Sequence, residues 1–142
     1  MGISIQKLVY VAGLAQVALV IGSFAIPGIQ NWRAELAKVR PLIRQIFWTY
    51  AAYILVINLC FGLISVFGYR ELTNGTVLAG LITGFIAVYW ISRVVVQFFY
   101  FDRTDFPDGK WTKIGETLLV GLFIFLSLVY TLACYHNYIL SI

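Results

Sequence analysis

The chain is poor in charged residues. Only 11% of its 142 residues are charged and 61% are hydrophobic, whereas soluble domains carry about 25% charged and about 45–50% apolar residues. A water-soluble fold of this length could not bury so much apolar surface, because small domains still expose a large share of their area. The composition therefore excludes a soluble globular protein and predicts a protein that has lipid as its solvent.

Histidine and cysteine are almost absent, which argues against metal and cofactor sites. His136 is the single histidine, so a haem held by two histidines is excluded. Cys60 and Cys134 do not form a C-x-x-C pair, and we interpret both as small apolar side chains. The motifs of zinc proteases, phosphate-binding loops and catalytic triads are also missing. We therefore predict no metal, no cofactor and no enzymatic activity.

Long hydrophobic runs are what the chain has in abundance. A helix that crosses a bilayer needs about 20 apolar residues. Runs that meet this requirement cover residues 5–26, 42–67, 77–101 and 114–140. With their connections they account for residues 1–142, so a single domain is expected. The predicted fold class is an all-α membrane protein, a bundle of four transmembrane helices.

The first connection, residues 28–40, changes abruptly to a polar composition. Pro27-Gly28 is predicted to end the first span. Asn31 is placed to cap a short helix. The apolar side of this helix would consist of Trp32, Leu36 and Val39. Such a pattern predicts a short interfacial amphipathic helix, lying in the headgroup plane between the first two spans; a plain polar connector is the alternative.

Basic residues are distributed unequally between the two ends of the predicted bundle. Lys7 and Arg70 lie at the end that holds both termini. The other end carries Arg33, Lys38, Arg40, Arg44, Arg103, Lys110 and Lys113. By the positive-inside rule, both longer loops are predicted to lie in the cytoplasm and both termini outside it. Short connections and this bias favour a bacterial inner membrane, with an organelle membrane as the alternative.

The net charge of +4 does not indicate nucleic acid. The cations are scattered between hydrophobic spans and do not form the clustered stripe that phosphate backbones need. In a membrane protein they set the topology and contact anionic lipid. We predict membrane lipids as partners and no nucleic acid.

Polar side chains within the spans are the candidate binding residues, because they cost free energy in hydrocarbon. They are Gln16, Asn58, Arg93 and Gln97. At 100° per residue, Tyr89, Arg93 and Gln97 share one side of the third span. A guanidinium beside an amide and a phenol can hold a lipid phosphate, a substrate carboxylate or an acid of a partner subunit. Alternatively, Arg93 extends to the headgroups or pairs with Glu116.

The opposite side of the third span carries small residues. Gly80, Gly84 and Ala87 resemble the G-x-x-x-G surface on which transmembrane helices approach closely. We predict that this side packs against another helix. Bulky substitution of Gly80 or Gly84 is expected to reduce any assembly that depends on it.

The amides of Gln16 and Asn58 have two interpretations. The simpler one is that they form hydrogen bonds between helices and hold the bundle together. The other is that they line a cavity filled with water or substrate.

These observations favour a non-enzymatic small membrane subunit that packs against a larger partner or against further copies of itself. The alternative function is binding or transport of a lipid or other anionic amphiphile, with Arg93, Gln97 and Asn58 lining the site. A lipid-modifying enzyme is a third hypothesis, since tyrosines, His136 and Glu116 can act as acids or bases, although their spacing does not require it.

Overall fold

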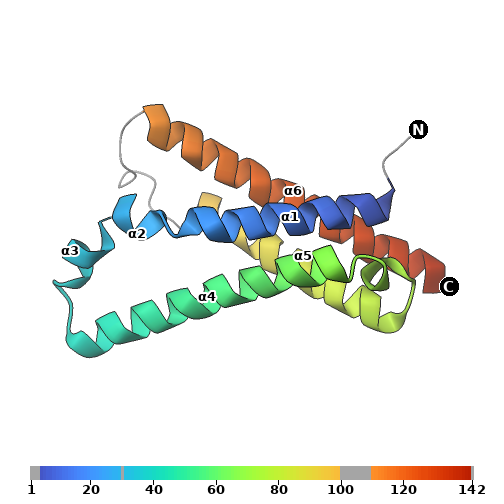
Figure 1. The fold of residues 1–142 in the computed structure, drawn as a ribbon, viewed down its shortest axis with the longest axis horizontal. Helices are drawn as coiled ribbons and strands as arrows, with labels where there is room; N and C mark the ends of the chain where they lie inside the picture. Colours follow the sequence, from blue (N-terminus) through green and yellow to red (C-terminus); the bar gives the residue numbers. More distant parts are fainter. Residues whose placement is uncertain (1–3, 30, 100–109, 142) are drawn as a thin grey trace.

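The computed structural model describes residues 4–29, 31–99 and 110–141. Helices make up 89% of these residues, and none of the described residues lies in a β-strand. Both ends of the chain lie at the same end of the molecule, at the right of Figure 1.

The prediction of four long apolar helices is confirmed. They are α1 (Ile5–Ser23), α4 (Pro41–Phe67), α5 (Val77–Phe99) and α6 (Lys110–Ser141). Each is long and apolar enough to span a membrane. Pro41 occupies the first turn of α4, where its missing N–H costs nothing. The last two residues of the predicted third span, 100 and 101, lie outside the described residues.

The first helix is shorter than predicted. It ends at Ser23, and Pro27 lies inside the separate short helix α2 (Ile26–Ile29). Proline has no N–H for the carbonyl four residues earlier, and its ring collides with that carbonyl. The carbonyl concerned belongs to Ser23, so the proline stops the helix one turn before its own position.

A short helix lies in the first connection, as the sequence predicts. This helix, α3 (Trp32–Leu36), leaves Val39 outside its bounds. Asn31 occupies the capping position, but in a left-handed conformation (φ 55°) and without a side-chain capping hydrogen bond. The predicted capping contact is therefore wrong. Trp32 instead fixes α3 by its edge-on contacts with Phe47 and Trp48 of α4, at centroid distances of 4.9 and 5.7 Å.

The connection between α4 and α5 contains a 3₁₀ turn, η1 (Glu71–Thr73). A turn at Asn74-Gly75 follows it. Gly75 has φ +82°, a conformation that glycine adopts without strain. Asn74 Oδ1 accepts hydrogen bonds from the Thr76 backbone N–H (3.0 Å) and hydroxyl (2.8 Å), which leads the chain into α5.

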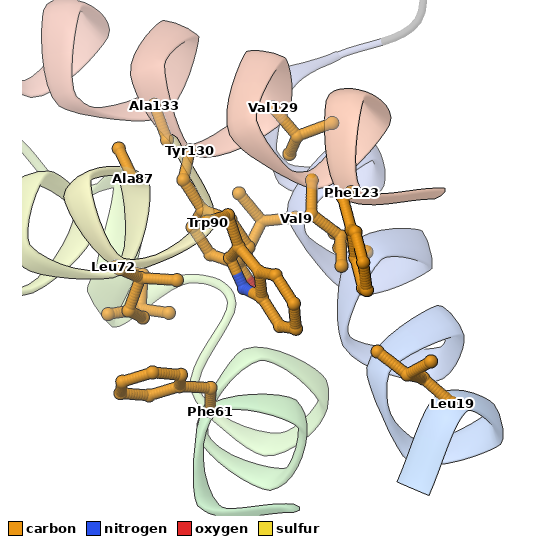
Figure 2. Packing of buried hydrophobic residues seen from close by; sticks show 13 residues of the cluster. Val9, Leu19, Phe61, Leu72, Ala87, Trp90, Phe123, Val129, Tyr130 and Ala133 are labelled. Atoms are coloured by element: carbon orange, nitrogen blue, oxygen red, sulfur yellow. The ribbon is translucent and has the colours of Figure 1, made fainter. Parts of the chain in front are cut away.

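The four long helices pack as two pairs, α1 along α4 and α5 along α6, and α1 also contacts α6. The pairs converge near η1, whereas the first halves of α4 and α6 diverge (Figure 1). All buried residues of α4 lie in its second half, from Asn58 to Ser65. The core is accordingly centred on α1, α5 and α6, around Trp90 and Tyr130 (Figure 2).

Candidate functional site

A buried hydrogen-bond network connects all four long helices around Gln16 of α1. Gln16 Nε2 donates to the Tyr130 hydroxyl of α6 (2.5 Å) and to the Ala12 carbonyl (3.2 Å). Gln16 Oε1 accepts from the indole N–H of Trp90 in α5 (3.1 Å). The Tyr130 hydroxyl also shares a short hydrogen bond with the Ser65 hydroxyl of α4. Gln16, Ser65, Trp90 and Tyr130 are fully buried.

The hydrogen-bonding groups of Gln16 are all used within the chain. Both amide hydrogens have acceptors and the amide oxygen has a donor, which makes the side chain well satisfied for its buried position. A ligand could reach this amide only by displacing an internal partner. The arrangement therefore fits the structural interpretation of Gln16, hydrogen bonding between helices.

Asn58 and Tyr89 form a second polar pair, between α4 and α5. The Tyr89 hydroxyl donates to Asn58 Oδ1 at 2.6 Å. Phe61 packs edge-on against the Tyr89 ring at 5.3 Å. The structure thus brings together two of the predicted site residues, and it directs them toward each other.

Arg93 lies beside an aromatic ring. Its guanidinium carbon is 5.1 Å from the centroid of Phe123 in α6, a cation–π arrangement. Among the described residues, no salt bridge joins Arg93 to Glu116. Gln97, one turn further along α5, is buried.

Trp90 lies between Gln16, Tyr89 and the Phe123 ring on which Arg93 packs. Its N–H contacts Gln16, its ring meets Tyr89 edge-on at 5.0 Å, and it stacks on Phe123 at 5.5 Å. Arg93 lies over the same Phe123 ring. The predicted site residues Gln16, Tyr89 and Arg93 are therefore neighbours through Trp90, which was not among the predicted site residues.

The small side of α5 faces α6 of the same chain. A Cβ atom at Gly84 would lie 3.2 Å from Cys134 Sγ, and one at Gly80 would lie 3.8 Å from Asn137 Cβ. Ala87 is buried. The Cys134 thiol is 3.6 Å from the Gly80 carbonyl oxygen. This side is thus occupied internally, and substitutions at Gly80 or Gly84 would disturb the chain itself before any partner.

The glycines between α1 and α4 lie in a tighter contact than those between α5 and α6. A Cβ atom at Gly13 would lie 2.8 Å from the Gly62 carbonyl oxygen and 2.8 Å from Ser65 Cβ. A Cβ atom at Gly62 would lie 3.0 Å from Val17 Cγ2. These two glycines allow the backbones to approach, and this approach brings Ser65 to the Tyr130 hydroxyl.

Asn137 of α6 is a buried amide that the sequence interpretation missed. Its Nδ2 donates to the Leu72 carbonyl at 2.7 Å, and its Oδ1 accepts from the Gly75 N–H at 3.0 Å. Nδ2 also lies 3.4 Å from Thr83 Oγ1. An amide within the predicted fourth span was a visible signal, the same one that singled out Asn58.

An apolar groove of about 460 Å³ lies between α1 and α6. Its lining includes Ala15, Ala18, Leu19 and Gly22 of α1 and Gly115, Leu118 and Leu122 of α6. Among the described residues that line it, Ser23 is the polar one, and its hydroxyl donates to the Leu19 carbonyl of its own helix at 2.7 Å. The described lining is therefore almost entirely apolar.

The described residues contain no group of three or more His, Cys, Asp or Glu side chains that could hold a metal ion. Cys60 is exposed and Cys134 is half-buried, and both are free thiols. No family model, curated protein or solved structure matches the chain. The geometry is therefore the basis on which a function can be argued.

Proposed function

We propose that the chain is a non-enzymatic subunit of a membrane complex, which packs through the first half of α4 against a partner protein or another copy of itself. One observation carries this proposal: within the described part of the chain, no side chain of α4 before Asn58 is buried. The close contact of Gly62 with Gly13 and Val17 of α1 lies in the second half of α4.

The exposed part of α4 is rich in large side chains. Those exposed between residues 50 and 57 include Tyr50, Tyr53, Ile54, Val56 and Ile57. In lipid there is no hydrophobic driving force for covering such a surface, so a partner would be held by close packing and by hydrogen bonds from the tyrosine hydroxyls. The rigid, amphipathic tyrosine ring suits this role.

Site-specific photo-crosslinking tests the proposal. A benzophenone amino acid placed at Tyr53 of α4 is activated in native membranes, and the same probe at Phe85 of α5 is the matched control. Both native side chains are 63% exposed. We expect a protein adduct at position 53 and only lipid adducts at position 85. Lipid adducts alone at both positions, together with a clean monomer in mild detergent, would rule out the proposal.

Arg93 supports a second candidate function, binding or transport of an anionic amphiphile. The favouring observation is a half-buried guanidinium, packed on Phe123, that forms no salt bridge with a described carboxylate. Gln97 would assist it, whereas Asn58 already accepts a hydrogen bond from Tyr89. Native mass spectrometry of the wild type and Arg93→Gln tests this function. Identical profiles of bound lipid in the two proteins would count against it.

For the orientation, we propose that the α3 end faces the cytoplasm of a bacterium and that both termini lie outside. The described cations support this: Arg33, Lys38, Arg40, Arg44 and Lys113 lie at the α3 end, and Lys7 and Arg70 at the other. A carboxy-terminal alkaline phosphatase fusion should be active and a green fluorescent protein fusion dark. The opposite result would reverse the orientation.

A further inference from the structure

The corner where α3 meets α4 combines three arginines with aromatic rings. It consists of Trp32, Arg33, Arg40, Arg44, Phe47 and Trp48, and we call it the basic corner. The nearby Lys38 and Glu35 pair with each other at 3.2 Å. Among the described residues, no carboxylate forms a salt bridge with Arg33, Arg40 or Arg44.

The two arginines of α4 present a double positive charge. Arg40 caps the helix without a side-chain hydrogen bond to it. The Arg44 N–H donates to the Arg40 carbonyl at 3.1 Å, so the two residues are one turn apart and share a side of the helix. Guanidinium groups in this arrangement match phosphate oxygens, which they bind through paired N–H donors.

The order of residues along α4 matches the layers of a lipid leaflet. Arg40 and Arg44 precede Phe47 and Trp48 along α4, and exposed apolar residues then continue to Phe67. Leu42, Ile43 and Ile46, around Arg44, are exposed as well. Arg44 and Trp48 are separated by roughly 6 Å of helix rise, which is comparable to the roughly 5–8 Å of headgroup region on each side of a bilayer. An acidic protein segment would match the arginines but would leave the aromatic layer unexplained.

We infer that the basic corner binds the phosphate of an anionic phospholipid, with Arg40 and Arg44 as its main ligands and Arg33 as a third cation. The ring contacts of Trp32 with Phe47 and Trp48 hold α3 against α4, which keeps Arg33 near the start of α4. This inference does not depend on the proposed subunit function, because the basic corner ends at Trp48, before the exposed side chains of residues 50–57 that carry that proposal, and because its occupant is a lipid, not a protein.

The test uses the full chain reconstituted in vesicles of equal phosphatidylglycerol and phosphatidylcholine. Native mass spectrometry of the protein released from these vesicles counts each bound lipid. We expect phosphatidylglycerol to be enriched on the wild type. Each cation near an anionic surface contributes a factor of roughly five, so Arg40→Gln with Arg44→Gln should reduce the enrichment by roughly 25-fold.

Two variants make the result specific. Arg70→Gln removes one exposed cation at the other end of the molecule, where Arg70 lies over the Tyr69 ring at 5.7 Å, and it should leave the enrichment unchanged. Arg40→Lys with Arg44→Lys keeps the charge but removes the paired N–H donors, so it should retain more of the enrichment than the glutamine variant and less than the wild type. The inference is overturned if the wild type binds both lipids equally. It is also overturned if Arg70→Gln reduces the phosphatidylglycerol enrichment as much as Arg40→Gln with Arg44→Gln does, or if an acidic peptide displaces the lipid.

Discussion

Gln16 and Tyr130 are 114 positions apart in the chain, and their side chains form a hydrogen bond of 2.5 Å in the centre of the bundle. Gln16 also accepts the Trp90 indole N–H, and Tyr130 contacts Ser65. One amide and one hydroxyl thus connect α1, α4, α5 and α6. Since such hydrogen bonds are directional, they fix the rotation of each helix, which apolar packing in lipid leaves poorly determined.

Gln16→Leu should destabilise the bundle by about 1–3 kcal/mol. The substitution keeps the volume but removes both hydrogen bonds between helices, and it leaves the buried Trp90 N–H without its acceptor. Unfolding in mixed detergent and dodecyl sulfate, followed by circular dichroism, measures the change. Gln6→Leu is the matched control, because Gln6 lies on the same helix and is exposed. Equal losses for the two variants would contradict a specific role for Gln16.

Gly13→Ala should also destabilise the chain by about 1–3 kcal/mol, because the added methyl group meets backbone and Cβ atoms of α4 at 2.8 Å. Gly22→Ala is the control on the same helix, where a Cβ atom meets nothing within 4 Å. That variant should change the stability by less than about 0.5 kcal/mol. The same unfolding assay distinguishes them, and a tolerated Gly13→Ala would show that α1 and α4 can separate freely.

The elements that depend on local sequence could be predicted well. Hydrophobic runs of sufficient length gave four helices, and proline and glycine marked their ends to within a few residues. The end of α1 was placed too late because the effect of Pro27 reaches back to Ser23, one turn earlier. The capping role of Asn31 failed because the backbone there is left-handed.

The contacts between helices could be predicted only in part. Gln16 was identified as a candidate for bonding between helices, but its partners were not, since nothing in the sequence indicates that α1 faces both Trp90 and Tyr130. The small residues of α5 were noticed, whereas Gly13 and Gly62, which lie in a tighter contact, were not. Which pairs of helices are neighbours depends on the arrangement of the whole bundle, and no local pattern contains this information.

The hydrogen bond between Tyr89 and Asn58 should contribute about 0.6–1.7 kcal/mol, the range measured for such bonds in membranes. A double-mutant cycle with Tyr89→Phe and Asn58→Leu isolates this coupling from the other effects of each change. The corresponding cycle with Tyr53→Phe and Asn58→Leu is the control, since Tyr53 is exposed on α4. A coupling free energy near zero between Tyr89 and Asn58 would mean that Asn58 is available to bind a ligand.

Asn137→Ala should loosen the connection between α4 and α5 without unfolding the helices. The Asn137 amide binds the Leu72 carbonyl and the Gly75 N–H, and its loss leaves both backbone groups without these partners. At about 1–3 kcal/mol for such a loss, amide hydrogens of residues 72–76 should exchange roughly tenfold faster or more. Tyr138→Ala, at an exposed neighbouring position, should leave their exchange unchanged. Hydrogen–deuterium exchange followed by mass spectrometry resolves this segment. An unaltered exchange rate in Asn137→Ala would mean that the turn at Gly75 is stable without the Asn137 hydrogen bonds.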